Sequence, residues 1–308
     1  MISLPPHLEM HDNRFAAMVH PMSTLDVIAE GFTWTEGPVW FGDHDCLLFS
    51  DIPSQRILRW SEREGVSVYR ERSGFNNGNT RDVQGRLIGC RHGERDVVRT
   101  EIDGSLTVLA DSFDGKRLNS PNDVVVSSDN AIWFTDPTYG IISNFEGYRS
   151  DPEQSARNVY RLSPDGELKV VASDFSQPNG LCFSPDETTL YIAESGSSHD
   201  DSVPAVIRKL AVDGANLRDK GVFAEIDRGL PDGMRCDTFG NLWSSAADGV
   251  HCFDSEGTRL GKILVPQVVS NLCFGGADGH RIFITATTSV YRVFVDVRGA
   301  EAWVRGRG

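Results

Sequence analysis

A polar side chain stands at the start of an apolar run six times along this chain, at intervals of roughly 40 to 60 residues. A repeat of that length is typical of propellers and solenoids, in which each unit is one supersecondary element. The repeated residues are carboxylates or carboxamides: Glu36, Asn79, Asn122, Asn179, Asp232 and Asn271. Six units that close into a ring would bring all six side chains to one axis.

Each unit also contains further short runs rich in β-branched and aromatic residues. In the first unit these runs cover residues 46–51, 56–60 and 66–69, and Asp-Gly, Pro-Asp and Asp-Asn turn signals separate such runs along the chain. Four strands per unit is the plan of a propeller blade. The pattern therefore predicts an all-β fold, a six-bladed β-propeller with four antiparallel strands per blade.

The way in which the ring closes can also be predicted. The segment Val27-Ile-Ala-Glu-Gly-Phe resembles the ends of the fourth strands at residues 108–113 and 170–175. We therefore expect the N-terminal strand to be the outer strand of the last blade, with the C-terminal Glu301-Ala-Trp-Val as the alternative. Such closure removes the exposed edges of an open sheet. Residues 1–24 are predicted to be an N-terminal arm over one face, and residues 25–308 a single propeller domain.

Composition restricts the partners and the compartment. A net charge of −14 without a basic stripe argues against nucleic acid as a partner. No apolar stretch approaches the ~18 residues of a membrane span, and no signal peptide is recognisable, so a cytoplasmic protein with no membrane contact is expected. The six cysteines lack a C-x-x-C pair, which favours buried free thiols over disulfides. A monomer or a homodimer fits this composition.

The six convergent side chains predict a cation site. First strands line the axis of a propeller, so the repeated residues should meet at one mouth of the central channel. The carboxylates of Glu36 and Asp232 would repel each other there unless a cation or protons compensated them. Carboxylate and amide oxygens are the ligands that calcium and magnesium prefer. We expect one divalent metal, Ca²⁺ first, with Zn²⁺, Mg²⁺ or Mn²⁺ as alternatives.

Two long loops should form the walls of this mouth. Loops after second strands return to the same face of a propeller, and long loops on a rigid scaffold are where binding function concentrates. Residues 137–157 include Tyr139, and residues 195–204 include His199. In the second unit the corresponding loop begins at Arg91 and His92.

Five segments are similar to the gluconolactonase / senescence marker protein (regucalcin) / luciferin-regenerating enzyme family. They are Thr35-Glu-Gly-Pro-Val-Trp, Asn119-Ser-Pro-Asn-Asp-Val-Val-Val, Phe134-Thr-Asp-Pro-Thr-Tyr-Gly, Gln177-Pro-Asn-Gly-Leu-Cys-Phe-Ser-Pro-Asp and Leu230-Pro-Asp-Gly. The resemblance covers residues 25 to 300 and implies a six-bladed propeller with one catalytic divalent metal, usually calcium. It also implies four protein ligands: Glu36, Asn122, Asn179 and Asp232.

The sequence departs from the family at one position. The regucalcin-like branch carries an arginine two residues before the asparagine that matches Asn122, and here that position is Ser120. Arg91 or His92 is the predicted replacement. The residues expected to bind substrate are Asn119, Ser120, Asp123, Arg91, His92 and Tyr139.

The resemblance implies metal-assisted hydrolysis of a small-molecule lactone. Asp232 is the expected general base as well as a ligand, and His92 is the alternative base. No Gly-x-Ser-x-Gly elbow supports a covalent mechanism. Three other functions stay open at this point: an organophosphate or phosphotriester hydrolase of the same propeller type, a non-catalytic calcium-binding protein, and a protein-interaction propeller.

Overall fold

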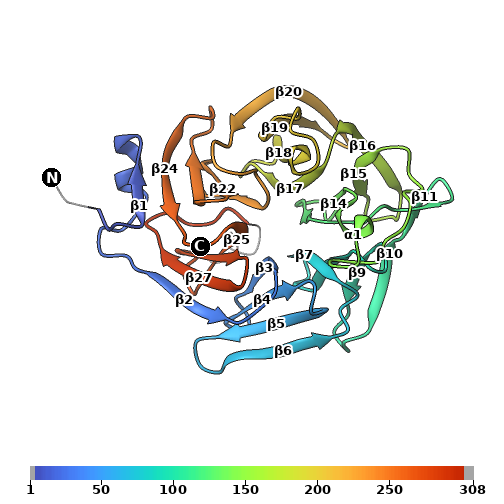
Figure 1. The fold of residues 1–308 in the computed structure, drawn as a ribbon, viewed down its shortest axis with the longest axis horizontal. Helices are drawn as coiled ribbons and strands as arrows, with labels where there is room; N and C mark the ends of the chain where they lie inside the picture. The colour runs from blue at the N-terminus through green and yellow to red at the C-terminus, as the bar shows by residue number, and fades with distance from the viewer. Residues whose placement is uncertain (1–3, 302–308) are drawn as a thin grey trace.

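Six antiparallel sheets surround one central axis in the computed structural model, which describes residues 4–301 (Figure 1). The predicted six-bladed β-propeller is therefore confirmed. Each blade runs outward from its first strand, so the first strands of all six blades line the axis. No helix within residues 4–301 is long and apolar enough to span a membrane.

The first three blades follow one another along the chain. Blade one comprises β3 (Thr35–Phe41), β4 (Cys46–Asp51), β5 (Arg56–Ser61) and β6 (Gly65–Glu71). Blade two comprises β7 (Asn76–Arg81), β8 (Leu87–Arg91), β9 (Asp96–Thr100) and β10 (Leu106–Ala110). A small hairpin, β11 (Ser112–Phe113) and β12 (Lys116–Arg117), leads to blade three, which comprises β13 (Val124–Val126), β14 (Ile132–Asp136), β15 (Arg157–Leu162) and β16 (Leu168–Phe175).

The other three blades repeat the plan. Blade four comprises β17 (Pro178–Phe183), β18 (Thr189–Glu194), β19 (Val206–Asp213) and β20 (Asn216–Glu225). Blade five contains β21 (Met234–Cys236), β22 (Leu242–Ala246), β23 (Gly249–Phe253) and β24 (Arg259–Leu264). Blade six contains β25 (Val269–Gly275), β26 (Arg281–Ala286) and β27 (Ser289–Phe294). The long loops carry α1 (Tyr139–Ile142) and the 3₁₀ turn η2 (Gly196–Ser198).

Strand β2 (Leu25–Glu30) completes blade six, so the predicted closure by the N-terminal strand is confirmed. It pairs antiparallel with β27, with Asp26 opposite Arg292. The blue N-terminal strand and the red C-terminal strands thus share one sheet (Figure 1). Of the alternative closing segment, only Glu301 lies among the described residues.

The N-terminal arm lies against blade five. Strand β1 (Leu8–Met10) pairs with β24 as a fifth strand, and the 3₁₀ helix η1 (Asn13–Ala17) follows it. Phe15 of η1 is fully buried, with its ring centroid 6.1 Å from that of Trp243. The arm therefore covers the outer edge of that blade and buries an aromatic side chain there.

The core lies between adjacent blades and is rich in aromatic rings. Trp40 of blade one stacks on Phe283 of blade six, with ring centroids 4.9 Å apart and planes 8° from parallel. All seven residues of β3 are buried, because both faces of an inner strand contact neighbouring blades. All six cysteines are buried and free, as predicted.

Candidate active site at the channel mouth

The repeated polar residues lie at one end of the inner strands. Four of them belong to these strands, and Asn122 and Asp232 precede β13 and β21 by two residues. The strand register shifts at this point in several blades, for example between Glu36 and Val39 and between Pro178 and Leu181. Such bulges redirect a side chain.

Glycines beside the repeated residues let adjacent inner strands approach closely. A Cβ placed on Gly180 would lie 1.9 Å from the Asp232 carbonyl oxygen, and one on Gly233 would lie 1.9 Å from the Asn271 side chain. Any side chain at either position would therefore force the blades apart. The convergence of the polar groups depends on these glycines.

Glu36 and Asp232 bring two carboxyl groups to the mouth, with Glu36 buried and Asp232 half-buried. Burial and then the neighbouring Asp123 raise the pKa of Glu36 to about 8. Burial and then Glu36 raise the pKa of Asp232 well above its ordinary value. A divalent cation near both would oppose these shifts and favour the ionised forms.

The amide of Asn179 fits a cation site. Its Oδ1 is buried and has no hydrogen-bond partner among the described residues. A buried acceptor without a hydrogen-bond partner lowers the stability of the fold by about 1–3 kcal/mol, and coordination to a hard cation would compensate for this loss. No group of three or more His, Cys, Asp or Glu side chains within residues 4–301 is placed to hold a metal. The expected ligand set is compatible with this, because two of its four members are asparagines.

The side chains of Asn79 and Asn271 form hydrogen bonds within the chain. Asn79 Nδ2 donates to the Gly37 carbonyl at 2.9 Å, and its Oδ1 accepts from Asn76 Nδ2 at 2.9 Å. Asn271 Nδ2 donates to Glu36 Oε2 at 3.0 Å, and its Oδ1 accepts from the Leu272 amide at 2.8 Å. Asn271 therefore orients Glu36, and Asn79 holds blade two against blade one.

These contacts predict opposite effects for two matched variants. Asn179→Ala should abolish tight calcium binding and leave the melting temperature of the calcium-free protein almost unchanged, because the side-chain oxygen of Asn179 accepts no hydrogen bond from residues 4–301. Asn79→Ala should retain calcium affinity but lower stability by about 1–3 kcal/mol, because it leaves buried groups unpaired. Calorimetric calcium titration and thermal melts measure both quantities. Equal calcium affinities for the two variants would contradict the assignment.

His92 is buried beside Asn122 and is held as a neutral imidazole. Its Nδ1 lies 3.1 Å from the Glu146 carbonyl oxygen, which can only accept, so Nδ1 carries the proton. Its Nε2 therefore accepts from Asn77 Nδ2 at 3.2 Å. Burial lowers the pKa of His92 to about 4. These features make His92 a weaker candidate base than Asp232, which is partly exposed at the mouth.

Arg91 and Ser120 are occupied by contacts within the chain. The Arg91 guanidinium forms a two-point ion pair with Asp96, with Nε 2.7 Å from Oδ1. Ser120 Oγ donates to the Pro137 carbonyl at 2.7 Å and accepts from the Gly140 amide at 3.0 Å. Arg91 and Ser120 thus reach a substrate only if these bonds are exchanged.

Asn119 and Asp123 flank Asn122 but face other groups. Asn119 Nδ2 donates to the Asp136 carbonyl at 3.1 Å, while its Oδ1 is buried without a partner in the described chain. Asp123 accepts from the Val124 amide at 2.9 Å and lies 3.9 Å from Arg235 Nη1. Arg235 in turn lies 3.3 Å from Glu301, so a buried arginine lies between these two carboxylates.

The insertion 137–157 reaches both neighbouring blades. Tyr139 Oη lies 3.1 Å from Ser198 Oγ and donates to the Ser195 carbonyl at 3.3 Å, which joins the two long loops. On the other side, the Tyr148 ring packs edge-on against Phe75 at 5.1 Å. Tyr139 therefore links the two long loops, and its contact with substrate stays a prediction.

Glu146 is a candidate that the sequence patterns missed. Its carbonyl oxygen binds His92, and its carboxylate contributes to raising the pKa values of both Glu36 and Asp232. Burial raises its own pKa to about 7. Besides Glu36, Asp232 and Asp123, a further carboxyl group thus acts on the mouth from the insertion, where no repeat could reveal it.

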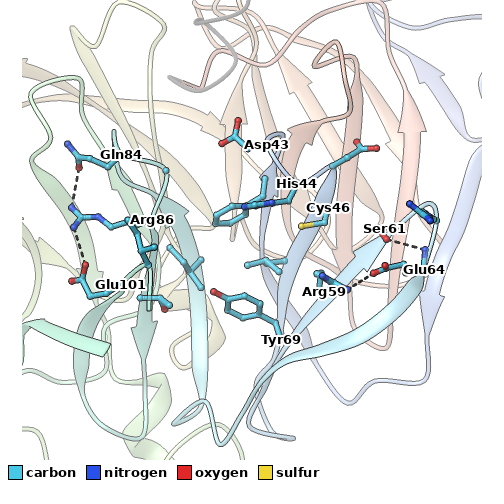
Figure 2. A pocket seen from close by; sticks show the side chains of 18 of the residues that line it. Asp43, His44, Cys46, Arg59, Ser61, Glu64, Tyr69, Gln84, Arg86 and Glu101 are labelled. Atoms are coloured by element: carbon cyan, nitrogen blue, oxygen red, sulfur yellow. Dashed lines mark hydrogen bonds and ion pairs between the residues drawn. The ribbon is translucent and has the colours of Figure 1, made fainter. Parts of the chain in front are cut away.

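A separate pocket of about 1070 Å³ lies at the other end of the strands, between blades one and two. Figure 2 shows Arg86 between Gln84 and Glu101, and Arg59 paired with Glu64. These arginines already have partners inside the pocket. Its lining includes Phe41 and Cys46, at the opposite ends of β3 and β4 from Glu36, so it is distinct from the channel mouth.

The chain matches one family model and is similar to known lactonases. The family described as SMP-30/Gluconolactonase/LRE-like region matches residues 34–288. The gluconolactonase of Zymomonas mobilis is 36% identical, over 91% of this chain and 83% of that protein. The pentonolactonase XacC of Haloferax volcanii is 29% identical, over 86% of this chain and 85% of that protein.

Two solved structures extend the comparison. A gluconolactonase from Xanthomonas campestris has a TM-score of 0.87 and 40% identity, with 94% of each chain covered. The calcium-binding protein regucalcin from Agrobacterium tumefaciens has a TM-score of 0.72 at 19% identity, with 89% of this chain and 94% of that chain covered. The second likeness shows a shared fold.

Proposed function

Because the chain belongs to the SMP-30/gluconolactonase/LRE-like family, whose curated members include lactonases, we propose that this lactone-hydrolysing enzyme depends on a divalent metal at the channel mouth. The observation that carries the proposal is the unpartnered buried oxygen of Asn179 beside two carboxylates with raised pKa values. Calcium is the first candidate, since the ligands are oxygens and a structural relative is a calcium-binding protein.

Four residues would hold the metal: Glu36, Asn122, Asn179 and Asp232. Two carboxylates neutralise one divalent ion, and two amide oxygens add ligands without further charge. Asn271 keeps Glu36 in place through its 3.0 Å hydrogen bond. When bound, the cation acts as a Lewis acid that polarises the lactone carbonyl.

Asp232 is the proposed general base. Its carboxylate takes a proton from the attacking water as the water oxygen bonds to the carbonyl carbon. The ring C–O bond then breaks, and the leaving oxygen takes up the proton that Asp232 received, which gives the hydroxy acid and restores the Asp232 carboxylate. His92 stays neutral and orients Asn77 and Asn122 through its Nε2, 3.2 and 3.5 Å from their Nδ2 atoms.

The substrate is proposed to be a neutral five- or six-membered sugar lactone. A neutral ester approaches the carboxyl groups at the mouth without adding charge. Glu146 and Tyr139 supply groups that can hydrogen-bond to ring hydroxyls. The gluconolactonase and pentonolactonase relatives make sugar lactones the first compounds to test.

A lactone panel tests the proposed function. We expect calcium-loaded protein to hydrolyse D-glucono-1,5-lactone, with acid release followed by a pH indicator, and chelator-treated protein to lose this activity. Readdition of calcium should restore it. Metal-loaded protein that is inactive on every lactone but cleaves a phosphotriester would assign the site to organophosphate hydrolysis. Inactivity on both classes with intact calcium binding would indicate a binding protein.

A further inference from the structure

Three buried acids end the second strands of blades one, three and four, at the mouth. They are Asp51, Asp136 and Glu194, and each is at most 6% exposed. The same three blades carry Glu36, Asn122 and Asn179. Blades two and six carry Asn79 and Asn271, whose side chains form hydrogen bonds within the chain. Their second strands end in Arg91 and Ala286, respectively.

Each of these acids accepts hydrogen bonds from two successive backbone amides. Asp136 Oδ2 accepts from the Asn119 amide and Oδ1 from the Ser120 amide, both at 2.8 Å. Glu194 Oε2 accepts from the Ser176 amide at 2.6 Å and Oε1 from the Gln177 amide at 2.8 Å. In each pair, the two amides belong to the residues three and two positions before the expected ligand, which is Asn122 in blade three and Asn179 in blade four.

Blade one uses the same arrangement with one difference. Asp51 Oδ1 alone accepts from both the Thr33 and the Trp34 amides, at 3.1 and 3.0 Å. These residues again lie three and two positions before the expected ligand, Glu36. The second oxygen of Asp51 makes no hydrogen bond to any part of the chain between residues 4 and 301.

In blade five a hydroxyl takes the place of the acid. The Asp232 amide donates to Ser245 Oγ at 3.0 Å, and Ser245 belongs to the second strand, β22. The amide that is held here belongs to the ligand itself. All four ligand blades therefore tie the ligand segment to a side chain near the end of the second strand.

We propose that Asp51, Asp136 and Glu194 are positioning residues that hold three ligand segments in the geometry required for the metal. The inference rests on the proposed metal site. Loops without such ties would lose conformational entropy when the cation binds, whereas tied loops have lost it during folding. Groups that orient metal ligands typically contribute about 10–100-fold to metal affinity.

Substitution of each acid by its amide separates the effect of the lost hydrogen bonds from the effect of the lost charge. Asp51→Asn can keep Oδ1 on both amides, since the new NH₂ replaces an oxygen without a partner. Asp136→Asn must turn an NH₂ group toward either the Asn119 or the Ser120 amide. Glu194→Gln must likewise leave one amide without its acceptor. All three variants lose one carboxylate at an equivalent position.

We expect calorimetric calcium affinity to fall about 10–100-fold in Asp136→Asn and Glu194→Gln and to change little in Asp51→Asn. Asp237→Asn is the matched stability control. Asp237 is fully buried at the far end of blade five, where Oδ1 accepts from the Phe239 amide and Oδ2 from Trp243 Nε1. This control should lower the melting temperature and leave calcium affinity unchanged.

Hydrogen exchange of the calcium-free proteins gives a readout that does not need the metal. The segment 118–124 should exchange faster in Asp136→Asn than in wild type, Asp51→Asn or Asp237→Asn. Equal loss of calcium affinity in all three acid variants, or unchanged exchange in Asp136→Asn, would overturn the proposal. If the wild-type protein bound no calcium, the proposed metal site would be overturned. Hydrogen exchange of the segment 118–124 would still decide whether Asp136 holds this segment in place.

Discussion

Asp232→Asn is expected to lower kcat for lactone hydrolysis by at least ~10²–10⁴-fold, the loss typical of removing a general base. The amide cannot accept the proton of the attacking water, and one ligand charge is lost as well. Steady-state kinetics at saturating calcium would measure the effect. The fold should survive, because the hydrogen bond to Ser245 comes from the backbone amide and not from the carboxylate.

A control separates the base from the ligand. Glu36→Gln also removes one ligand charge, but it leaves Asp232 in place. If Asp232 is both ligand and base, Asp232→Asn should stay inactive at calcium concentrations that saturate it, while Glu36→Gln recovers part of its activity. If saturating calcium fully restored the activity of Asp232→Asn, Asp232 would be a metal ligand only. His92 would then become the candidate base.

Removal of the metal is expected to have the second large effect. Chelation should abolish turnover and destabilise the fold, because calcium at a hundred times its dissociation constant stabilises the folded state by about 2.7 kcal/mol. Without a cation, Glu36 and Asp232 must take up protons or repel each other. Thermal melts with chelator and with millimolar calcium test this, and identical midpoints would contradict a bound metal.

The blade plan was predictable because it is periodic. Strand composition, turn signals and the six-fold polar repeat are local properties, and the phrase Val27-Ile-Ala-Glu-Gly-Phe identified the closing strand, which β2 confirms. The family resemblance is confirmed by the comparisons. The metal ligands stay predictions, supported by the free oxygen of Asn179.

The environment of each site residue was less predictable. Ser120 and Arg91 were expected to face substrate, but both form bonds within the chain, Ser120 with Pro137 and Arg91 with Asp96, and sequence patterns did not reveal these partners. Glu146 lies in an insertion that belongs to no repeat. The acids that end three second strands, in contrast, were visible in the sequence as Asp51, Asp136 and Glu194, and only their hydrogen bonds show why they matter.

Closure of blade six by β2 constrains the order in which the protein can fold. The bond between Asp26 and Arg292 joins residues 266 positions apart. During synthesis β2 emerges before the strands of blades one to five and must wait for β27, so its pairing that closes the ring is among the last available to the nascent protein. Contacts of such long sequence separation form slowly. Until then β2 remains a strand without its partner, and the five earlier blades form an open arc with exposed edges.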